Sequence, residues 1–442
     1  MTDIHPNRPV VDQGSRHFLQ LDHLHTSLAD PAMTSMNFLN EVAIRFPDAI
    51  SFAAGRPTEE FFDAADVHRH LDVFIDHLCR ERAMTMEEAR RIVLQYGRTK
   101  GIIHDLVARQ LAVDDDIHIP HESVVVTVGC QEAMFLVLRA LRSTPEDIVL
   151  AVSPTYVGLA GAARLVDMPV WPVQGGDRGV DLGDLRTQVH RARQTGLRPR
   201  AFYVIPDVAN PTGISLDVDA RRELLRFATA EDLLILEDNA YGIFAGEPRL
   251  PSLKTLDPDR RVVRLGSFAK TVLPGARVGY VVADQDVEDH EGGVSLLADH
   301  LSTIKSMLTV NTSPLAQAVV GGALLTHEHS LLTANRKECD LYQRNLSLMR
   351  AGLAHHLTPF TDRVSWNTPA GGFFLTLTVP FEADDALLER SAEKYGVLWT
   401  PMSHFYSGDG GSHQIRLSFS QSTPESIDTG LERLASLIAD CC

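Results

Sequence analysis

Short apolar runs and amphipathic stretches alternate along the chain from about residue 85 onward. Helical spacing marks residues 87–94, 103–111 and 131–141, while residues 123–128 predict a buried strand that ends at Gly129. Further apolar runs of strand length lie at residues 148–153, 201–205, 233–237, 262–266 and 278–282. Because short buried strands separated by helices are typical of parallel sheets covered on both faces, the pattern predicts an α/β protein with a mostly parallel sheet.

The pattern changes towards both ends of the chain. Residues 1–45 are polar and mixed, which indicates an N-terminal arm with one short helix near residues 34–46. A long charged helix is expected after residue 325, and two strands and a last helix then follow, at residues 372–379, 414–419 and 424–439. We therefore expect one large sheet domain and a smaller α/β domain built from both chain ends. The expected divisions are an arm (1–45), the N-terminal part of the small domain (46–84), the large domain (85–325) and the C-terminal small domain (326–442).

Composition and charge narrow the possible partners. The 442 residues are 44% apolar and 22% charged, as in ordinary globular proteins, and the net charge is −17. This charge argues against nucleic acid and anionic membranes as partners. We find no apolar run of about 18 residues that would indicate a membrane span, and no secretory signal near Met1. The five cysteines lack C-x-x-C spacing, so we expect no metal site and a reducing, cytoplasmic location.

The segment 267–280 carries the most informative chemistry. Ser267 stands three residues before Lys270, and Arg277 stands seven residues after it. An amine that forms a Schiff base with an aldehyde, with a hydroxyl and a guanidinium for a phosphate, is what a pyridoxal phosphate site requires. Taken alone, the fragment is more typical of an ordinary loop with a solvated lysine. Few other amines compete, because the chain has only six lysines: Lys100, Lys254, Lys270, Lys305, Lys337 and Lys394.

Polar residues also follow other expected strands. Gly129, Cys130 and Gln131 open a helix, and the first N–H groups of a helix can bind a phosphate. Tyr156 follows the next strand, where it can stack on a flat ring. Asn210 begins the turn Asn-Pro-Thr-Gly, and its amide can donate to a phenolate oxygen. Each of these features by itself is also compatible with an ordinary turn or rim residue.

Two charged side chains and an early turn complete the set. Asp238 ends an apolar strand, where it can pair with a protonated pyridine nitrogen or cap a helix. Tyr241, three residues on, can donate to the same phenolate oxygen. Arg416 lies inside an alternating strand and is either a structural ion-pair partner or a bidentate clamp for a substrate carboxylate. Gly55 and Arg56 belong to a Gly-x-Pro turn after an early strand.

In this order, at the strand ends of one α/β pattern, the features are not a plausible coincidence. From about Ser35 to the C-terminus the chain resembles the aspartate-aminotransferase-fold (class I/II) family of pyridoxal phosphate enzymes, nearest the branch of kynurenine and 2-aminoadipate aminotransferases. The most specific pieces are Asn-Pro-Thr-Gly (210–213), Asp-x-x-Tyr (238–241) and the stretch 267–277. The resemblance implies a large domain with a seven-stranded, mostly parallel sheet, bound pyridoxal 5′-phosphate and an aminotransferase reaction.

The resemblance also implies a role for each residue. Its catalytic positions are Lys270, as Schiff-base lysine and proton carrier, Asp238, as partner of the pyridine nitrogen, and Tyr241. The cofactor-binding positions are Gly129, Cys130, Gln131, Ser267 and Arg277 around the phosphate, Tyr156 against the ring, and Asn210 with Tyr241 at the ring oxygen O3′. The substrate-binding positions are Gly55, Arg56, Asn210 and Arg416, with Arg416 on the α-carboxylate.

One further motif and three departures bear on assembly and specificity. Tyr96, in Leu-Gln-Tyr-Gly (94–97), matches a family motif that reaches the phosphate of the neighbouring subunit, so the resemblance implies a homodimer with shared active sites. Cys130 stands where the family often has Ser, and Ala240 where many members have Pro; neither removes a catalytic group. Arg56 stands where relatives often carry an uncharged residue, which makes it a candidate for side-chain specificity.

Three functions remain open on the sequence. The first is an aminotransferase that acts on an aromatic, arylglycine or 2-aminoadipate-like L-amino acid and a 2-oxo acid. The second is another pyridoxal phosphate-dependent reaction, such as elimination, substitution, decarboxylation or oxidation, which needs no added 2-oxo acid. The third is a non-catalytic regulator, although the arm lacks the basic helix of a DNA-binding extension. The similarity of residues 38–42 and 54–57 to arylglycine aminotransferases points to arylglycines.

Overall fold

Seven strands form the central sheet of the computed structural model, which describes the chain apart from residues 1–18, 31–32, 34–37, 39–40, 43 and 177. The strand order is β2-β8-β7-β6-β5-β3-β4, and β8 runs antiparallel to both of its neighbours while the other pairs are parallel. The strands are β2 (Val124–Thr127), β3 (Asp147–Ser153), β4 (Val170–Gln174), β5 (Arg198–Val204), β6 (Leu234–Asp238), β7 (Val262–Ser267) and β8 (Gly279–Val282). The expected α/β fold with a mostly parallel seven-stranded sheet is confirmed. The helix expected near residues 34–46 lies largely outside the described residues.

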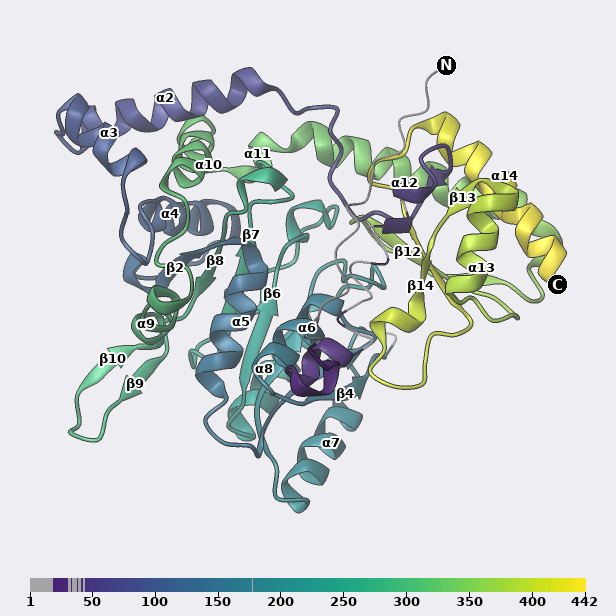
Figure 1. The fold of residues 1–442 in the computed structure, drawn as a ribbon, viewed down its shortest axis with the longest axis horizontal. Coiled ribbons are helices and arrows are strands. Elements are labelled where there is room, and N and C mark those ends of the chain that lie inside the picture. Colours follow the sequence, from purple (N-terminus) through teal and green to yellow (C-terminus); the bar gives the residue numbers. More distant parts are fainter. Residues whose placement is uncertain (1–18, 31–32, 34–37, 39–40, 43, 177) are drawn as a thin grey trace, which may run out of the picture.

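Helices cover both faces of this sheet (Figure 1). One face packs against α5 (Gly129–Leu141), α6 (Val157–Leu165) and α9 (Leu297–Leu308). The other packs against α4 (His104–Asp115), α7 (Leu182–Gln194) and α8 (Val218–Ala230). Strands covered on both faces have no solvent side, which explains the continuous apolar run of β2. In the part of the chain that the structure describes, no helix is both long and apolar enough to cross a membrane.

Two elements of this region were not expected from the sequence. The edge strand β4 contains Trp171 and Pro172, and a proline within a short run argues against a strand except at a sheet edge, which is where β4 lies. Helix α2 (Ala64–Glu81) begins after Asp63, whose carboxylate caps it, and histidines among its buried positions dilute its apolar face. It packs against α10 (Pro314–Thr326), where a side chain at Gly322 would collide with the α2 backbone.

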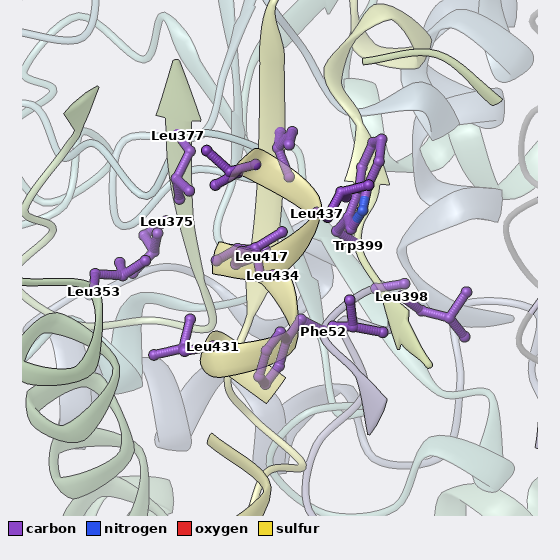
Figure 2. Close-up of a cluster of buried hydrophobic side chains, with 14 of the residues drawn as sticks. Phe52, Leu353, Leu375, Leu377, Leu398, Trp399, Leu417, Leu431, Leu434 and Leu437 are labelled. Carbon is purple, nitrogen blue, oxygen red and sulfur yellow. The ribbon is translucent and has the colours of Figure 1, made fainter. Parts of the chain in front are cut away.

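A second, smaller unit lies at the right of Figure 1. Its antiparallel sheet has the order β11-β12-β15-β14, and the short strand β1 (Ile50–Ser51) pairs beside it with β13 (Val397–Leu398). The sheet strands are β11 (Ser365–Trp366), β12 (Phe374–Thr378), β14 (Thr400–Pro401) and β15 (Gln414–Ser418), and the helices of this unit are α12 (Arg336–His356), α13 (Asp385–Arg390) and α14 (Pro424–Cys441). Figure 2 shows Phe52, from the early part of the chain, in one core with Trp399 and leucines of α14. Both chain regions therefore contribute to this core.

The remaining helices are α3 (Met86–Leu94), which packs against α2 and α10, and α11 (Leu331–Ala334), which packs against α4. A hairpin of β9 (Asp286–Glu288) and β10 (Val294–Leu296) projects from the molecule (Figure 1). The expected divisions at residues 45, 84 and 325 stay predictions.

Candidate active site

The carboxyl ends of the parallel strands bring the candidate residues to one edge of the sheet. Gly129 follows β2, Tyr156 follows β3, Asn210 follows β5, and Asp238 ends β6. Ser267 ends β7, Lys270 follows it, and Arg277 precedes β8, which runs in the opposite direction. In open α/β sheets this edge is where ligands bind. The second unit adds Arg416 from β15.

Lys270 differs from the other buried lysines in its partners. Its Nζ donates a hydrogen bond to the carbonyl oxygen of Gly55 at 2.9 Å, and it has no ion pair with any carboxylate in the described part of the chain. Lys337 is exposed. The other four lysines each pair with a carboxylate: Lys100 with Asp299 at 2.6 Å, Lys254 with Asp284 at 2.6 Å, Lys305 with Glu132 at 2.7 Å and Lys394 with Asp440 at 2.7 Å. Apart from the exposed Lys337, only Lys270 is without a carboxylate partner among the described residues.

Burial and neighbouring positive charges lower the pKa of the Lys270 amine. Burial, followed by the charges of Arg277, Arg416 and Arg56 in that order, lowers the pKa of Lys270 from 10.5 to about 8. Because no carboxylate compensates, the charged form of Lys270 is disfavoured. A neutral amine is both a nucleophile and a base, which a protonated lysine is not.

We expect Lys270 in the cofactor-free protein to react with an amine-directed reagent with a midpoint near pH 8. Only the neutral amine reacts, so a lowered pKa moves the reaction to lower pH. The labelled fraction of the Lys270 peptide, measured by mass spectrometry over a pH series, gives the midpoint. The exposed Lys337 serves as the reference for the reagent itself. A midpoint at 10.5 would contradict the desolvated site.

Asp238 is buried between two donors. It is 4% exposed, its Oδ2 accepts a hydrogen bond from the hydroxyl of Tyr203 at 2.6 Å, and its Oδ1 accepts a longer one from the thiol of Cys130 at 3.6 Å. Burial raises the pKa of Asp238, and these two hydrogen bonds oppose that shift. The side chain of Cys130 therefore points towards this acid. The thiol itself keeps its proton, because burial raises its pKa well above the ordinary value.

Arg416 is a buried cation held by neutral groups. Its Nη1 donates to Asn210 Oδ1 at 2.7 Å, and its Nη2 donates to the carbonyl oxygen of Ala53 at 2.7 Å. The guanidinium carbon lies 4.4 Å from the ring centroid of Phe374 and 4.8 Å from that of Phe405. Burial lowers its pKa from 12.5 to about 10, and its buried Nε has no partner. A desolvated guanidinium without a carboxylate is an incomplete ion pair.

Tyr241 lies beside these groups. Burial raises its pKa, against the opposing effect of a hydrogen bond from Asn210. The ring of Tyr241 packs edge-on against Phe374 at 5.7 Å, and Lys270 Nζ lies 5.8 Å from its centroid. Asn210 thus connects the phenol to the guanidinium of Arg416. One cluster therefore contains a phenol, an amide, an amine and a guanidinium, from Tyr241, Asn210, Lys270 and Arg416.

An anion-binding corner lies where α5 begins. Gly129 adopts φ +72°, and a side chain there would come within 2.5 Å of Arg277 Nη2, so the guanidinium lies against the first turn of the helix. The N-cap residue Val128 makes no capping hydrogen bond with its side chain, although its own N–H donates to Glu132 Oε2 at 2.6 Å. The free N–H groups, the helix dipole and the guanidinium all favour a negative charge. Ser267, ten residues before Arg277 in the sequence, accepts a hydrogen bond from the backbone N–H of Ala269 at 3.1 Å.

Gln131 and Tyr156 lie together at the same corner. Gln131 Nε2 donates to the carbonyl oxygen of Gly158 at 2.6 Å, so its amide already has a partner. A side chain at Gly158 would collide with the ring of Tyr156. Burial raises the pKa of Tyr156 to about 12, so this phenol stays neutral. Tyr156 therefore offers a neutral aromatic face.

The residues present fit pyridoxal phosphate. Lys270, Arg277, Arg416 and Arg56 form no ion pair with a carboxylate among the described residues, although the chain carries a net charge of −17. Unpaired cations at one site call for anionic ligands. The donor set includes a helix N-terminus and a guanidinium for a dianion, an amine for an aldehyde and a buried acid for a ring nitrogen. The orphaned Nε of Arg416 suits a separate carboxylate.

Sequence reasoning did not find several residues of the site. Tyr203 belongs to an expected strand, but an apolar strand with one tyrosine has no signal that distinguishes a functional hydroxyl. Phe374 and Phe405 resemble ordinary core residues, and Thr400, which accepts from Arg416 at 3.1 Å, lies in a two-residue strand. No sequence pattern links them to Arg416.

Arg56 and Tyr96 are exposed in a single chain. The side chain of Arg56 makes no hydrogen bond to another described residue, whereas its carbonyl oxygen accepts from Ser420 Oγ at 2.6 Å. Tyr96 is 81% exposed and lines a groove of about 580 Å³ with Thr309 and Leu315. Its phenol makes no hydrogen bond to any residue that the structure describes. One chain therefore does not bring Tyr96 to the site.

A His–His–Glu group lies elsewhere, formed by His104, His121 and Glu122. Arg98 Nη1 lies 2.9 Å from His104 Nε2 and 3.1 Å from Glu122 Oε1, and Lys100 lies 3.5 Å from the same carboxylate. The hydrogen bond from Arg98 lowers the pKa of Glu122 to about 2. Two cations already neutralise this acid, which disfavours a metal ion there. The expectation of no metal site stays a prediction.

Comparisons with known proteins cover nearly the whole chain. A family model described as aminotransferase class I and II matches residues 82–434. The chain is 56% identical over 420 residues to the (S)-3,5-dihydroxyphenylglycine transaminase of Amycolatopsis orientalis, covering 95% of this chain and 94% of that protein. The solved kynurenine aminotransferase of Pyrococcus horikoshii is similar with a TM-score of 0.79 and 25% identity, over 94% of this chain and 96% of that one. The α-aminoadipate aminotransferase of Thermus thermophilus, complexed with N-(5′-phosphopyridoxyl)-L-leucine, gives a TM-score of 0.74 and 28% identity, over 94% of this chain and 99% of that one.

Proposed function

Because this chain belongs to the class I and II aminotransferases, we propose that it transfers an amino group between an arylglycine and a 2-oxo acid, with pyridoxal phosphate bound at Lys270. The aminotransferase activity rests on the family and on a 56% identical transaminase. The arylglycine side of the proposal rests on the name of that relative. The observation that carries the cofactor is a reactive lysine without a carboxylate partner, set among three arginines.

The cofactor supplies an electron sink that acidifies the Cα–H of a bound amino acid. Lys270 Nζ accepts and returns that proton, since its lowered pKa makes the neutral amine accessible near pH 8. Asp238 would favour a proton on the ring nitrogen through its negative charge. Asn210 and Tyr241 would donate to the ring oxygen O3′, and Tyr156 would pack against the ring. The N–H groups of Gly129, Cys130 and Gln131, with Ser267 and Arg277, would hold the phosphate.

The proposed substrate contacts come from the second unit and from the turn at Gly55. Arg416 binds the α-carboxylate, which completes its ion pair and gives Nε a partner. The rings of Phe374 and Phe405 keep the guanidinium plane in place and exclude water from it. Gly55 must lack a side chain, because a Cβ would lie 2.4 Å from the Phe374 ring. The exposed Arg56 faces the substrate side chain.

The experiment that tests this function is a substrate panel on the purified protein. We expect arylglycines to give turnover with added 2-oxo acid, and none without it. Loss of the arylglycine amino group and gain of an amino group by the 2-oxo acid, followed together by chromatography, establish transfer. Product formation without a 2-oxo acid would instead indicate elimination, decarboxylation or oxidation. Turnover of other amino donors but of no arylglycine would leave an aminotransferase and refute the donor class.

Substitutions of two arginines should distinguish binding that all substrates share from binding of particular side chains. Arg416→Lys should lower kcat/KM for every donor and acceptor. The expected loss of transition-state stabilisation is about 2–3 kcal/mol, because lysine cannot make two parallel hydrogen bonds to a carboxylate. Arg56→Ala should act unevenly, with the greatest loss for acidic or carbonyl-bearing side chains, because their oxygens are the strongest acceptors for its guanidinium. Both variants are measured on one panel of side chains. Equal losses across the panel for Arg56→Ala would contradict its selective role.

The proposal includes a homodimer with shared active sites. Large apolar side chains are exposed at the end of α3 and from the end of α9 to the start of α10: Leu94, Tyr96, Met307, Leu308, Val310 and Leu315, which are 46–86% exposed. Of these, Leu94, Tyr96 and Leu315 line one groove. Exposed apolar side chains of this size are found at interaction sites, and a second copy is the partner that the family implies. In this arrangement Tyr96 reaches the phosphate bound by the other subunit.

Hybrid dimers test the shared site. We expect Lys270→Ala chains and Tyr96→Phe chains, each impaired as homodimers, to recover activity when mixed. In the hybrid, the site with the intact Lys270 receives its Tyr96 from the Lys270→Ala chain, so one site is complete. Activity is measured after mixing and refolding, with unmixed chains as controls. Without recovery, and with Tyr96→Phe homodimers clearly impaired, each site would be contained in one chain.

A further inference from the structure

The acid of the site is held by a tyrosine that no part of the proposed function uses. Tyr203 is 1% exposed, and its hydroxyl donates to Asp238 Oδ2 at 2.6 Å. Such a short O–H···O distance is typical of a hydrogen bond to an ionised carboxylate. The second donor, the thiol of Cys130, lies 3.6 Å from Oδ1. A thiol is a weak donor, so Tyr203 makes the stronger of the two bonds.

The sheet explains how the two side chains meet. Tyr203 on β5 is paired with Leu236 on β6, and Asp238 stands two residues further along β6. Side chains two residues apart share a face of a strand, so Tyr203 and Asp238 are diagonal neighbours on one face. A tyrosine is long enough to span such a diagonal. Helix α5 covers this face and brings Cys130 to the other side of the acid.

The surroundings make Asp238 dependent on its donors. Burial and then the neighbouring Glu237 favour its neutral form, while the hydrogen bonds from Tyr203 and Cys130 lower its pKa. It has no ion pair with a lysine, arginine or histidine among the residues that the structure describes. Burial also raises the pKa of Tyr203 well above its usual value, so this hydroxyl keeps its proton and acts as a donor. The phenol thus supplies the strongest contact that favours the carboxylate.

We propose that Tyr203 is a positioning residue for the aminotransferase reaction: its hydroxyl keeps Asp238 ionised and aligned towards the ring nitrogen of the cofactor. This inference rests on the proposed binding of pyridoxal phosphate. It adds a residue that acts only through Asp238. A neutral Asp238 cannot stabilise a protonated ring nitrogen by charge, so removing the hydroxyl weakens both cofactor binding and proton transfer at Cα.

The test is Tyr203→Phe, which removes one oxygen and keeps the ring in the core. We expect kcat to fall about 10-fold or more, as for loss of a hydrogen bond to a charged group, with KM for both substrates changed less than about 2-fold. The dissociation constant for pyridoxal phosphate, titrated by absorbance, should rise by a similar factor. Tyr280→Phe is the matched control, since this buried hydroxyl lies beside Arg264, and it should leave the constant within about 2-fold.

A double-mutant cycle separates positioning from packing. If Tyr203 acts through Asp238, adding Tyr203→Phe to Asp238→Asn should change kcat and cofactor affinity by less than about 2-fold. Losses that multiply in the double variant would overturn the inference, because they would show an effect independent of the acid. The melting temperature of each cofactor-free variant shows whether the fold is kept.

Failure of the role proposed for Tyr203 can be told apart from failure of the proposed function. A wild-type protein that binds no pyridoxal phosphate refutes the function itself. A wild-type protein that binds it, with Tyr203→Phe equal to wild type in kcat and affinity, refutes only the role of Tyr203. If Tyr203→Phe does not fold, the comparison of Cys130→Ala with wild type decides: a small loss in cofactor affinity supports control of Asp238 by its donors, and no loss contradicts it.

Discussion

Lys270→Ala should abolish turnover, with a loss of at least about 10⁴-fold, on the order of 5 kcal/mol in the barrier. The variant loses both the nucleophile that binds the cofactor and the base at Cα. Four of the other five lysines pair with carboxylates and Lys337 is exposed, so no nearby amine substitutes. The measurement is single-turnover kinetics with the cofactor added in excess.

The fold should survive this substitution. Lys270 has no carboxylate partner among the described residues, so its removal leaves no uncompensated buried charge, and the melting temperature of the cofactor-free protein should change little. Lys337→Ala, at an exposed position, is the matched control and should retain full activity. In the wild type, borohydride reduction should attach the cofactor to the peptide that contains Lys270. Attachment to the peptide of Lys254 or Lys305 would disprove the assignment.

Asp238→Asn should lower kcat by about 10²-fold or more, on the order of 3 kcal/mol. An amide has almost the same shape as the carboxylate and still accepts from Tyr203, but it carries no charge. The ring nitrogen then loses its proton more readily, and the electron sink is weaker. Cofactor binding should weaken but not be lost, because the proposed phosphate contacts at Gly129 and Arg277 are unchanged.

The absorbance of the bound cofactor over a pH series checks this reason directly. In the wild type the spectrum should report a protonated ring over a wider pH range than in Asp238→Asn. A variant with near-normal kcat would place the acid elsewhere. The melting temperature is the control for packing, since Asp238 is only 4% exposed.

Much of the central sheet followed from local pattern. The strands expected at residues 123–128, 201–205 and 233–237 correspond to β2, β5 and β6, with ends shifted by a few residues. They were predictable because strands buried on both faces are apolar over most of their length. The edge strand β4 was not, since Pro172 argues against a strand unless its place at the edge is known. Helix α2 was missed for its mixed composition.

The location of the site was predictable for a related reason. Polar residues directly after apolar strands, such as Asn210 and Asp238, must gather at one edge once the strands are parallel. The parallel pattern therefore puts Lys270 and Asp238 at the same edge of the sheet, and the family resemblance puts them in one site. The roles of these residues stay predictions, while the family and the fold are confirmed.

The sequence by itself determined the residue types, the succession of apolar strands along the chain and the lysine with its flanking hydroxyl and arginine. Only the tertiary structure decided which charges remain unpaired. Arg416 meets Asn210 across 206 residues and lies between Phe374 and Phe405, and Lys270 has no carboxylate while Lys254 and Lys305 do. Hydrophobic periodicity is local and is written along the chain, whereas ion pairing and desolvation depend on distances between segments that are remote in sequence.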